Sequence, residues 1–185
     1  MTAAGSVIAD ERLRLFLGLR LPADVLDAIV AWQAEYLRGG VRVVPREHLH
    51  ITLAFLGHRP AGELDAIVSA LRSAAAAAGG DMRLAAARYR ETRAVSMLVL
   101  DDLDGGATAF ADDLQGRLEA LGVYQREGRP WLPHVTVARF RERPRLRLES
   151  PPMGTFVPSD AAAYLSRLHP GGARYEVLES VALGG

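Results

Sequence analysis

Apolar residues recur along the chain with two different periods, and the change of period divides it into strands and helices. Segments in which apolar and polar residues alternate predict strands. We expect these strands at 12–22, 41–45, 48–57, 82–90, 94–102, 134–140, 160–170 and 173–183. Segments with apolar residues at helical spacing predict helices. We expect these helices at 23–37, 61–78 and 104–122.

Proline and glycine residues agree with these boundaries. Pro22 can open the first helix, Gly79 and Gly80 close the second, and Gly122 ends the third. No linker rich in serine or proline interrupts the chain, so we expect one compact unit over residues 1–185. Because consecutive strands can pair antiparallel, the expected fold class is α+β.

Two of the predicted strands repeat an unusual pair of polar residues. His50 and Thr52 are two apart in "HLHITLAFLG", and His134 and Thr136 are two apart in "PHVTVARF". Successive side chains of a strand point to opposite faces, so each imidazole shares a face with its hydroxyl while the intervening apolar residues face a core. If the two strands lie near each other, the four groups converge. The repeat also indicates a weak internal duplication.

These four groups suit acid–base chemistry on a phosphate. An unperturbed imidazole has a pKa of roughly 6.5, so two of them can act as base and acid in one in-line displacement. Threonine hydroxyls can donate hydrogen bonds to non-bridging oxygens, and the fork-shaped guanidinium of Arg139 suits phosphate. No carboxylate follows either histidine at a metal-ligand spacing, so we expect no metal and no cofactor. A single such pair is more often structural, and we interpret His48, His58 and His169 in that way.

Composition narrows the possible functions further. The chain has no cysteine, which excludes disulfides, thiolate metal sites and a cysteine nucleophile. All 22 basic residues are arginine, which excludes Schiff-base lysines and a lysine-containing phosphate loop. The formal net charge of zero argues against a global field that attracts nucleic acid. No signal-peptide pattern precedes the first strand, and the composition fits a cytoplasmic protein.

The chain resembles the two-histidine phosphoesterases in four stretches, namely "RLFLGLRLP", "REHLHITLAFLG", "PHVTVAR" and "SRLHPGGARYEVL". Within that superfamily it is similar to the bacterial and archaeal RNA 2′,3′-cyclic phosphodiesterases, once called 2′-5′ RNA ligases. The resemblance runs from about Arg12 to Leu183. It implies a bilobal, pseudo-duplicated α+β fold with antiparallel sheets, flanking helices and an active-site cleft between the lobes.

The resemblance also implies roles for individual residues. The catalytic pair would be His50 and His134. The substrate-binding residues would be Thr52, Thr136 and Arg139 at the phosphate and Phe55 near the nucleoside. One position departs from the family pattern, because His48 stands where relatives often carry asparagine or another polar residue. A third imidazole there could perturb the pKa of His50 or could face water.

We therefore expect a metal-independent phosphodiesterase that opens a 2′,3′-cyclic phosphate on an RNA end or nucleotide and leaves a 2′-phosphate. We assign His50 as the acid and His134 as the base, although the sequence identifies only the pair. Two other hypotheses stay open. The protein could act on 2′-5′-linked oligonucleotides, by cleavage or ligation, or on another cyclic nucleotide, or it could bind RNA ends without turnover. We expect a monomer with no membrane partner.

After the second motif, residues 141–149 are expected to continue extended, with an edge or a break at Pro144, and arginines alternate from Arg139 onward. If one continuous strand carried them, they would share a face. These residues are Arg139, Arg141, Arg143, Arg145 and Arg147. They could form a solvated strand edge or a cationic rim beside the cleft. Pro144 argues against an unbroken strand, and we expect a phosphate contact only from Arg139.

Overall fold

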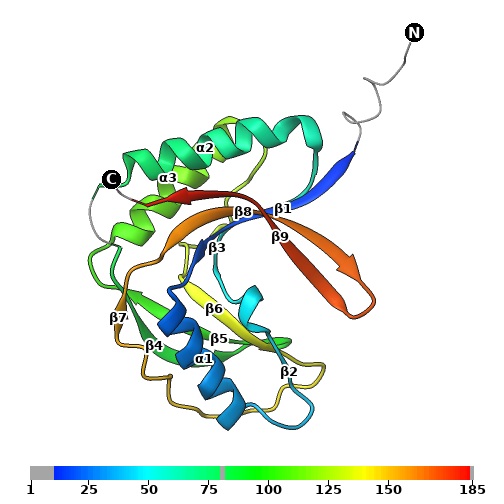
Figure 1. Cartoon of the computed structure of the whole chain (residues 1–185), viewed down its shortest axis with the longest axis vertical. Coiled ribbons are helices and arrows are strands. Elements are labelled where there is room, and N and C mark those ends of the chain that lie inside the picture. The colour runs from blue at the N-terminus through cyan, green and yellow to red at the C-terminus, as the bar shows by residue number, and fades with distance from the viewer. Residues whose placement is uncertain (1–10, 80–81, 184–185) are drawn as a thin grey trace.

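The computed structural model describes residues 11–79 and 82–183 of the 185-residue chain. In this described part, nine strands form one antiparallel sheet and three α-helices pack around it (Figure 1), which confirms the expected α+β class. The segment 1–10, in which no signal-peptide pattern was found, and Gly80, expected to close the second helix, lie outside the described residues. Every helix in the described ranges falls short of the length and apolar character that a membrane crossing needs.

The observed elements follow the predicted ones closely. The strands are β1 (Arg12–Arg20), β2 (Arg42–Val43), β3 (Ile51–Pro60), β4 (Leu84–Glu91), β5 (Val95–Asp102), β6 (His134–Arg139), β7 (Thr155–Phe156), β8 (Asp160–His169) and β9 (Gly172–Ala182). The α-helices are α1 (Ala23–Tyr36), α2 (Leu64–Ala77) and α3 (Gly106–Ala120). Two short 3-10 helices lie at Arg46–His48 and Ala61–Glu63.

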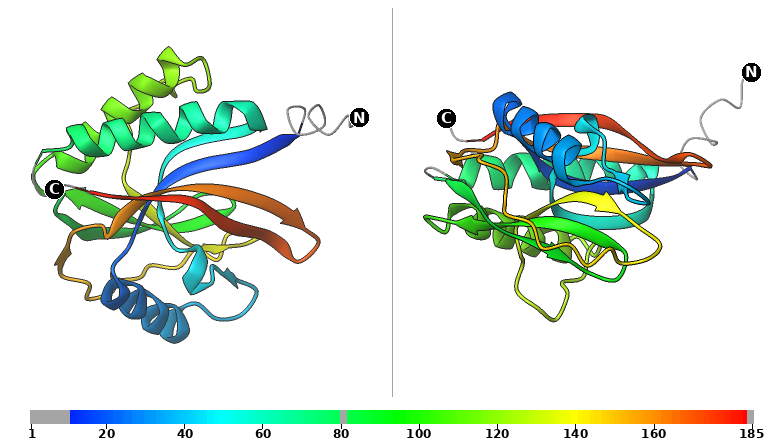
Figure 2. Two further views of the ribbon diagram at one scale, coloured as in Figure 1. Left: turned by 45° about the horizontal axis from the view of Figure 1, so that its top comes forward. Right: turned by 90° about the horizontal axis from the view of Figure 1, so that it is seen from below.

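The sheet consists of two halves that meet at a narrow joint. Its strand order is β7-β4-β5-β6-β3-β1-β8-β9, with β2 pairing β6 beside this path. The central strands β3 and β6 pair at one residue pair in the described part, Ile51 with Val135, whereas β1 and β3 pair along nearly their whole length. The resemblance implied separate antiparallel sheets, whereas the two halves here, β7-β4-β5-β6 and β3-β1-β8-β9, are joined at this pair into one sheet (Figure 2).

The helices bury the faces that their apolar spacing predicts. In α3, Phe110, Leu114 and Leu118 follow one another at four-residue steps and are almost completely buried. α2 and α3 pack side by side, and α1 lies apart from them (Figures 1 and 2). Full burial of one large apolar side chain contributes about 1.5–3 kcal/mol. The framework that holds the two central strands is therefore built from ordinary apolar packing.

Two local predictions are wrong. The strand expected to begin at His48 begins at Ile51, because Arg46–His48 form a 3-10 helix after Pro45. Residues 141–149, expected to be extended, contain no strand. The backbone N–H groups of Arg145 and Leu146 there donate to the carboxylate of Glu91, at 3.0 and 2.8 Å, so they are not available to a strand ladder.

Candidate active site

The two His-x-Thr motifs face each other across the joint of the sheet. Ile51 and Val135 pair directly, are completely buried and point into the core. Because the pairing is antiparallel, the residues on either side are crossed, so that His50 lies opposite Thr136 and Thr52 lies opposite His134. The predicted convergence of two imidazoles and two hydroxyls thus follows from the register of a single residue pair.

A backbone carbonyl two residues upstream orients each imidazole. His50 Nδ1 lies 2.7 Å from the carbonyl oxygen of His48, and His134 Nδ1 lies 2.8 Å from that of Leu132. A carbonyl oxygen can only accept, so Nδ1 carries the hydrogen in both rings and Nε2 is left for chemistry. Nε2 of His50 lies 3.0 Å from the hydroxyl oxygen of Thr52. Both histidines therefore present the same ring nitrogen.

A bulge follows each motif and changes which residues face the cleft. On β3, Leu53 has no partner on β1, and on β6, Val137 has no partner on β5. Each extra residue reverses the alternation of side chains beyond it. Phe55 and Arg139, three residues after their threonines, consequently lie on the same face as the motifs. Strict alternation would have turned both away from the cleft.

A buried glutamine supports each bulge. Gln115 on α3 donates its side-chain amide to the Leu53 carbonyl oxygen at 2.8 Å, and Gln33 on α1 donates to the Val137 carbonyl oxygen at 2.8 Å. The two glutamines are 6% and 2% exposed. A bulge leaves backbone groups outside the regular ladder, and leaving a buried one without a partner costs about 1–3 kcal/mol. The glutamines therefore stabilise the two irregularities that shape the site.

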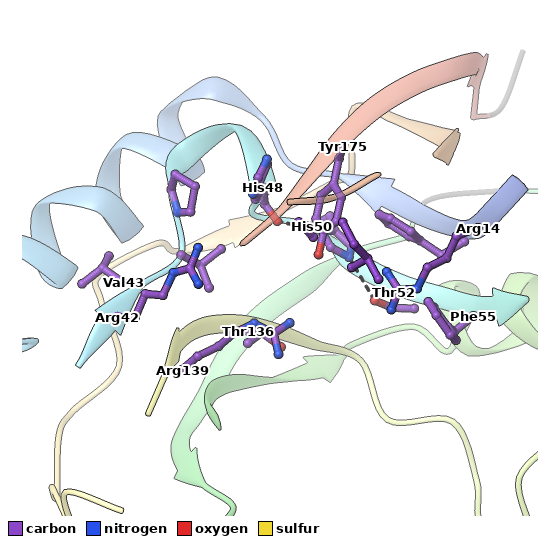
Figure 3. A pocket seen from close by; sticks show the side chains of 15 residues that line it. Arg14, Arg42, Val43, His48, His50, Thr52, Phe55, Thr136, Arg139 and Tyr175 are labelled. Carbon is purple, nitrogen blue, oxygen red and sulfur yellow. Dashed lines mark hydrogen bonds between the residues drawn. The ribbon is translucent and has the colours of Figure 1, made fainter. Parts of the chain in front are cut away.

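The motifs open onto a cavity of about 380 Å³. Five of the predicted site residues line it, namely His50, Thr52, Phe55, Thr136 and Arg139. The remaining one, His134, is half-buried and does not line the cavity, although its charge is close enough to lower the pKa of His50. The lining also includes His48, Arg14, Phe16, Arg42 and Tyr175. Figure 3 labels all of these except Phe16. Among residues 11–79 and 82–183, no aspartate or glutamate lines the cavity, so the ionisable groups of its described lining are all basic or phenolic.

His50 lies in an aromatic environment that keeps it neutral. Its ring centroid is 4.8 Å from that of Phe16 and 5.7 Å from those of Tyr164 and Tyr175. Burial disfavours the imidazolium and is the main cause that lowers the pKa of His50 to about 4. The carbonyl of His48 opposes this shift, while the positive charges of His134, His48 and Arg139 add to it. At neutral pH, His50 in the unliganded protein is therefore a proton acceptor.

The third histidine of the region belongs to the cavity wall. The ring of His48 lies 4.4 Å from that of Tyr175, and its carbonyl oxygen holds His50. Burial lowers the pKa of His48, with Glu47 opposing the shift and Arg42 adding to it. The interpretation of His48 as a merely structural residue is thus incomplete, because its backbone positions a motif imidazole.

Phe55 forms part of one end of the cavity together with Arg14. The Phe55 side chain is 49% exposed, and the Arg14 guanidinium carbon lies 4.8 Å from its ring centroid. Arg14 is held in place by a 2.6 Å hydrogen bond to the hydroxyl of Ser166. An aromatic ring with one face against a guanidinium and with half its surface exposed can stack with a nucleobase on its open side.

The arginines beyond Arg139 do not continue the site. β6 ends at Arg139, so they do not share one strand face. Arg143 Nε lies 3.1 Å from Glu91 Oε2, and Arg143 and Arg147 line a different pocket. Burial alone would raise the pKa of Glu91, but hydrogen bonds from Leu146, Tyr89, Arg143 and Arg145 together lower it. The carboxylate fixes this segment, which explains why the segment leaves the sheet.

Several site residues carried no signal in the sequence. Arg14, Arg42 and Tyr175 belong to ordinary strands, and Gln33 and Gln115 belong to ordinary helices. Their roles depend on contacts with segments far away in the chain. One partial signal exists for Gln33 and Gln115, because each is a polar residue next to the apolar positions of a helix. Over residues 11–79 and 82–183, no group of three or more His, Cys, Asp or Glu side chains is arranged to hold a metal ion.

Comparison with known proteins agrees with this geometry. Residues 19–88 match the family model described as LigT like phosphoesterase. The chain is 32% identical over 182 residues to the RNA 2′,3′-cyclic phosphodiesterase of Thermus thermophilus. This alignment covers 94% of this chain and 91% of that protein. It is 29% identical over 177 residues to the enzyme of the same name from Escherichia coli K12, with coverage of 94% and 98%. The crystal structure of TT0787 of Thermus thermophilus superimposes with a TM-score of 0.78 at 27% identity, covering 94% of this chain and 99% of that one.

Proposed function

Because this chain belongs to the family of LigT-like phosphoesterases, we propose that it hydrolyses the 2′,3′-cyclic phosphate at an RNA end to a 2′-phosphate, without a metal ion. The observation that carries the proposal is the crossed arrangement of the two motifs around Ile51 and Val135. It places the two imidazoles and the two hydroxyls on neighbouring positions of two paired strands, with His50, Thr52 and Thr136 in the cavity lining and His134 beside it. The names of the Thermus thermophilus and Escherichia coli relatives support the choice of substrate.

The arrangement suits an in-line displacement at phosphorus. His50 and His134 occupy diagonal positions of an antiparallel pair, and such positions lie about 7–8 Å apart, which leaves room for a phosphoryl group between them. One imidazole takes a proton from the attacking water, whose oxygen bonds to phosphorus. The P–O3′ bond breaks, and the second imidazole gives its proton to the departing O3′.

The environment of His50 favours an assignment of acid and base opposite to the one expected from the sequence. A pKa of about 4 makes His50 neutral near pH 7, so it is ready to accept a proton and poorly able to donate one. We therefore assign His50 as the base and His134 as the acid. The more open setting of His134, which lies outside the cavity lining, is compatible with the acid role.

The remaining residues of the site would bind the substrate. Thr136 and Arg139 would donate hydrogen bonds to the non-bridging oxygens as negative charge develops in the transition state. Thr52 donates its one hydroxyl hydrogen to Nε2 of His50 in the unliganded site, and it would turn to a non-bridging oxygen when that nitrogen takes the proton of the water. Phe55 would stack with the base of the terminal nucleotide, on the ring surface that Arg14 leaves open. Donors that are already in place act without reorganisation during the reaction, which is how such sites stabilise charge.

The proposal is tested by incubating the full chain with a 2′,3′-cyclic nucleotide in excess EDTA and following the product by ³¹P NMR. We expect turnover in the chelator and a single 2′-phosphate product. A 3′-phosphate product would contradict the proposed leaving group, and loss of activity that zinc restores would contradict the metal-independent mechanism. Cleavage of 2′-5′-linked oligonucleotides in place of the cyclic substrate, or tight binding without turnover, would favour one of the alternative hypotheses.

A further inference from the structure

The cavity has two chemically different ends. At one end, Phe55 exposes its aromatic ring beside Arg14 (Figure 3). At the other end, Arg42 and Arg139 bring two guanidiniums to the same side of the cavity (Figure 3). The labelled motif side chains lie between these ends. A substrate that reacts at the motifs therefore meets an aromatic surface on one side and two cations on the other.

The pairing of Arg42 with Arg139 is unfavourable unless an anion lies between them. The two residues are direct cross-strand partners on β2 and β6, and like charges in that position destabilise a sheet. Neither forms an ion pair with any described residue, and no carboxylate lines the cavity. Elsewhere in the described part, ten different arginines take part in eleven ion pairs, since Arg126 makes two. Ten further arginines also lack an ion pair with any described residue, so it is the shared place of Arg42 and Arg139 on the wall of the cavity that points to a ligand.

The reacting phosphate accounts for only one of these two cations. In the proposed function Arg139 contacts that phosphate, and Arg42 has no role. Arg42 is exposed, and its guanidinium has five N–H donors. Within the described residues its side chain makes one hydrogen bond, to the carbonyl oxygen of Gly171 in the turn between β8 and β9. Most of its donors are therefore available to a ligand.

We propose that Arg42 binds a second phosphate, namely the phosphodiester that joins the terminal nucleotide to the rest of an RNA chain. The proposal rests on the proposed function, because the cyclic phosphate must occupy the motifs for the next phosphate to reach Arg42. Cross-strand partners in a sheet have Cα atoms about 4.5–5.5 Å apart. Arg42 and Arg139 can therefore hold two phosphates that are neighbours along one RNA chain. Arg42 would make the site prefer the end of an RNA chain to a free cyclic nucleotide.

Three substrates distinguish the contribution of the second phosphate from that of the terminal nucleotide and its cyclic phosphate. The first is a 2′,3′-cyclic mononucleotide with a 5′-hydroxyl, which has only the reacting phosphate. The second is the same nucleotide with a 5′-phosphate, and the third is a dinucleotide that ends in a 2′,3′-cyclic phosphate. The kcat/KM of each is measured in the wild-type protein and in Arg42→Gln. Glutamine removes the charge but is shorter than arginine, so Arg42→Lys, which keeps the charge and most of the length, controls for the lost contact with Gly171.

We expect the preference for the dinucleotide over the 5′-hydroxyl mononucleotide to fall about tenfold or more in Arg42→Gln, the effect of one lost charge-assisted hydrogen bond. Arg42→Lys should retain part of it, because it keeps the charge without the fork. Salt should lower kcat/KM for the dinucleotide less steeply in Arg42→Gln than in the wild-type protein, because one screened charge pair is missing. Arg88→Gln removes an equal charge from an exposed position of β4 outside the cavity, and it should leave the preference unchanged.

Other outcomes would overturn the proposal. Equal losses on all three substrates would place Arg42 at the reacting phosphate, and an unchanged preference would leave it as a surface residue. A loss confined to the 5′-phosphorylated mononucleotide would mean that the site reads a terminal phosphomonoester instead of an RNA chain. If the wild-type protein turns over none of the substrates, the proposed function fails. The subsite is then tested by calorimetric titration, in which Arg42→Gln must weaken binding of the dinucleotide more than that of the 5′-hydroxyl mononucleotide.

Discussion

Ile51 and Val135 oppose each other at the joint of the two sheet halves, and antiparallel pairing makes this pair a local two-fold centre. The local two-fold relates the His-x-Thr pair on one side to the His-x-Thr pair on the other. It also relates the bulge at Leu53 to the bulge at Val137. An in-line displacement needs a proton acceptor on one side of the phosphorus and a donor on the other. A two-fold arrangement of identical imidazoles meets that need, provided that their surroundings differ.

The imidazoles themselves are the first test. His50→Ala and His134→Ala should each lower kcat for a cyclic mononucleotide by about two to four orders of magnitude, because each removes one proton-transfer group. His58→Ala is the matched control, since His58 is exposed on β3 outside the cavity lining. Circular dichroism confirms that the variants are folded. Turnover within a few-fold of wild type in folded His50→Ala or His134→Ala would remove that residue from the mechanism.

Arg139 is expected to act on the reacting phosphate. Arg139→Ala should reduce kcat/KM for the 5′-hydroxyl cyclic mononucleotide by about a hundredfold or more, which is the usual effect of removing one preorganised donor to the developing charge. Arg141→Ala serves as the control, because Arg141 is exposed beyond the end of β6 and does not line the cavity. If the two variants behave alike, Arg139 has no special contact with the phosphate.

The pH dependence tests the lowered pKa of His50. If His50 is the base, it must be neutral to act, so kcat/KM for a cyclic mononucleotide should rise with pH through about 4, the pKa of His50 in the free protein. The profile is measured from about pH 3.5 upward, within the range where circular dichroism shows the fold to be intact. A rising limb near pH 6.5, roughly the ordinary value of an imidazole, would contradict the lowered pKa on which the assignment of His50 as the base depends. NMR titration of the His50 ring measures the same pKa directly.

Gly18 is expected to set the position of His50. A Cβ added at Gly18 would lie 3.0 Å from the Ile51 carbonyl oxygen and 3.2 Å from Cδ2 of His50, both tighter than ordinary contact. Gly18→Ala should therefore displace the imidazole and lower kcat more than it raises KM. Gly62→Ala is the control, since a Cβ at Gly62 meets nothing within 4 Å. Equal kcat and KM for Gly18→Ala and Gly62→Ala would show that His50 keeps its position when a methyl group is added at Gly18.

Long periodic segments were predicted well because their burial is decided locally. The helix expected at 23–37 is α1 at Ala23–Tyr36, and the strand expected at 134–140 is β6 at His134–Arg139. The motif residues were also identifiable, since a repeated His-x-Thr pair on strands has few structural explanations. Their convergence needed only that the two strands be neighbours.

The features that the sequence did not predict depend on contacts between distant segments. A bulge is invisible in the alternation of "HITLAF" and "HVTVAR", because the extra residue is as apolar as its neighbours. Arg42 becomes part of the site only through the pairing of β2 with β6. The pKa of His50 is lowered mainly by burial, and the rings that lie beside His50, those of Phe16, Tyr164 and Tyr175, come from three other strands. Each of these requires the assembled sheet.

The buried glutamines give the last prediction, because each acts on one motif from a helix. Gln115 donates to the Leu53 carbonyl and Gln33 to the Val137 carbonyl, directly after the two threonines. Leucine has about the same size but removes the hydrogen bond to the Leu53 carbonyl in Gln115→Leu, and those to the Val44 and Val137 carbonyls in Gln33→Leu, where Val137 keeps the N–H of Val44 as a donor. Each replacement should lower the free energy of unfolding by about 1–3 kcal/mol. A loosened bulge should also lower kcat with little change in KM, because it misplaces the groups of the transition state.

The two variants should act on opposite sides of the site. Gln115→Leu should shift the NMR resonances of His50 more than those of His134, and Gln33→Leu should do the reverse, because each glutamine supports the bulge next to only one histidine. Gln125→Leu, at an exposed position, is the control for a glutamine-to-leucine change. Loss of stability with both imidazole resonances and kcat unchanged would reduce the glutamines to structural residues. A selective shift of one ring in each variant, together with a loss in kcat, would show that the helices position the motifs.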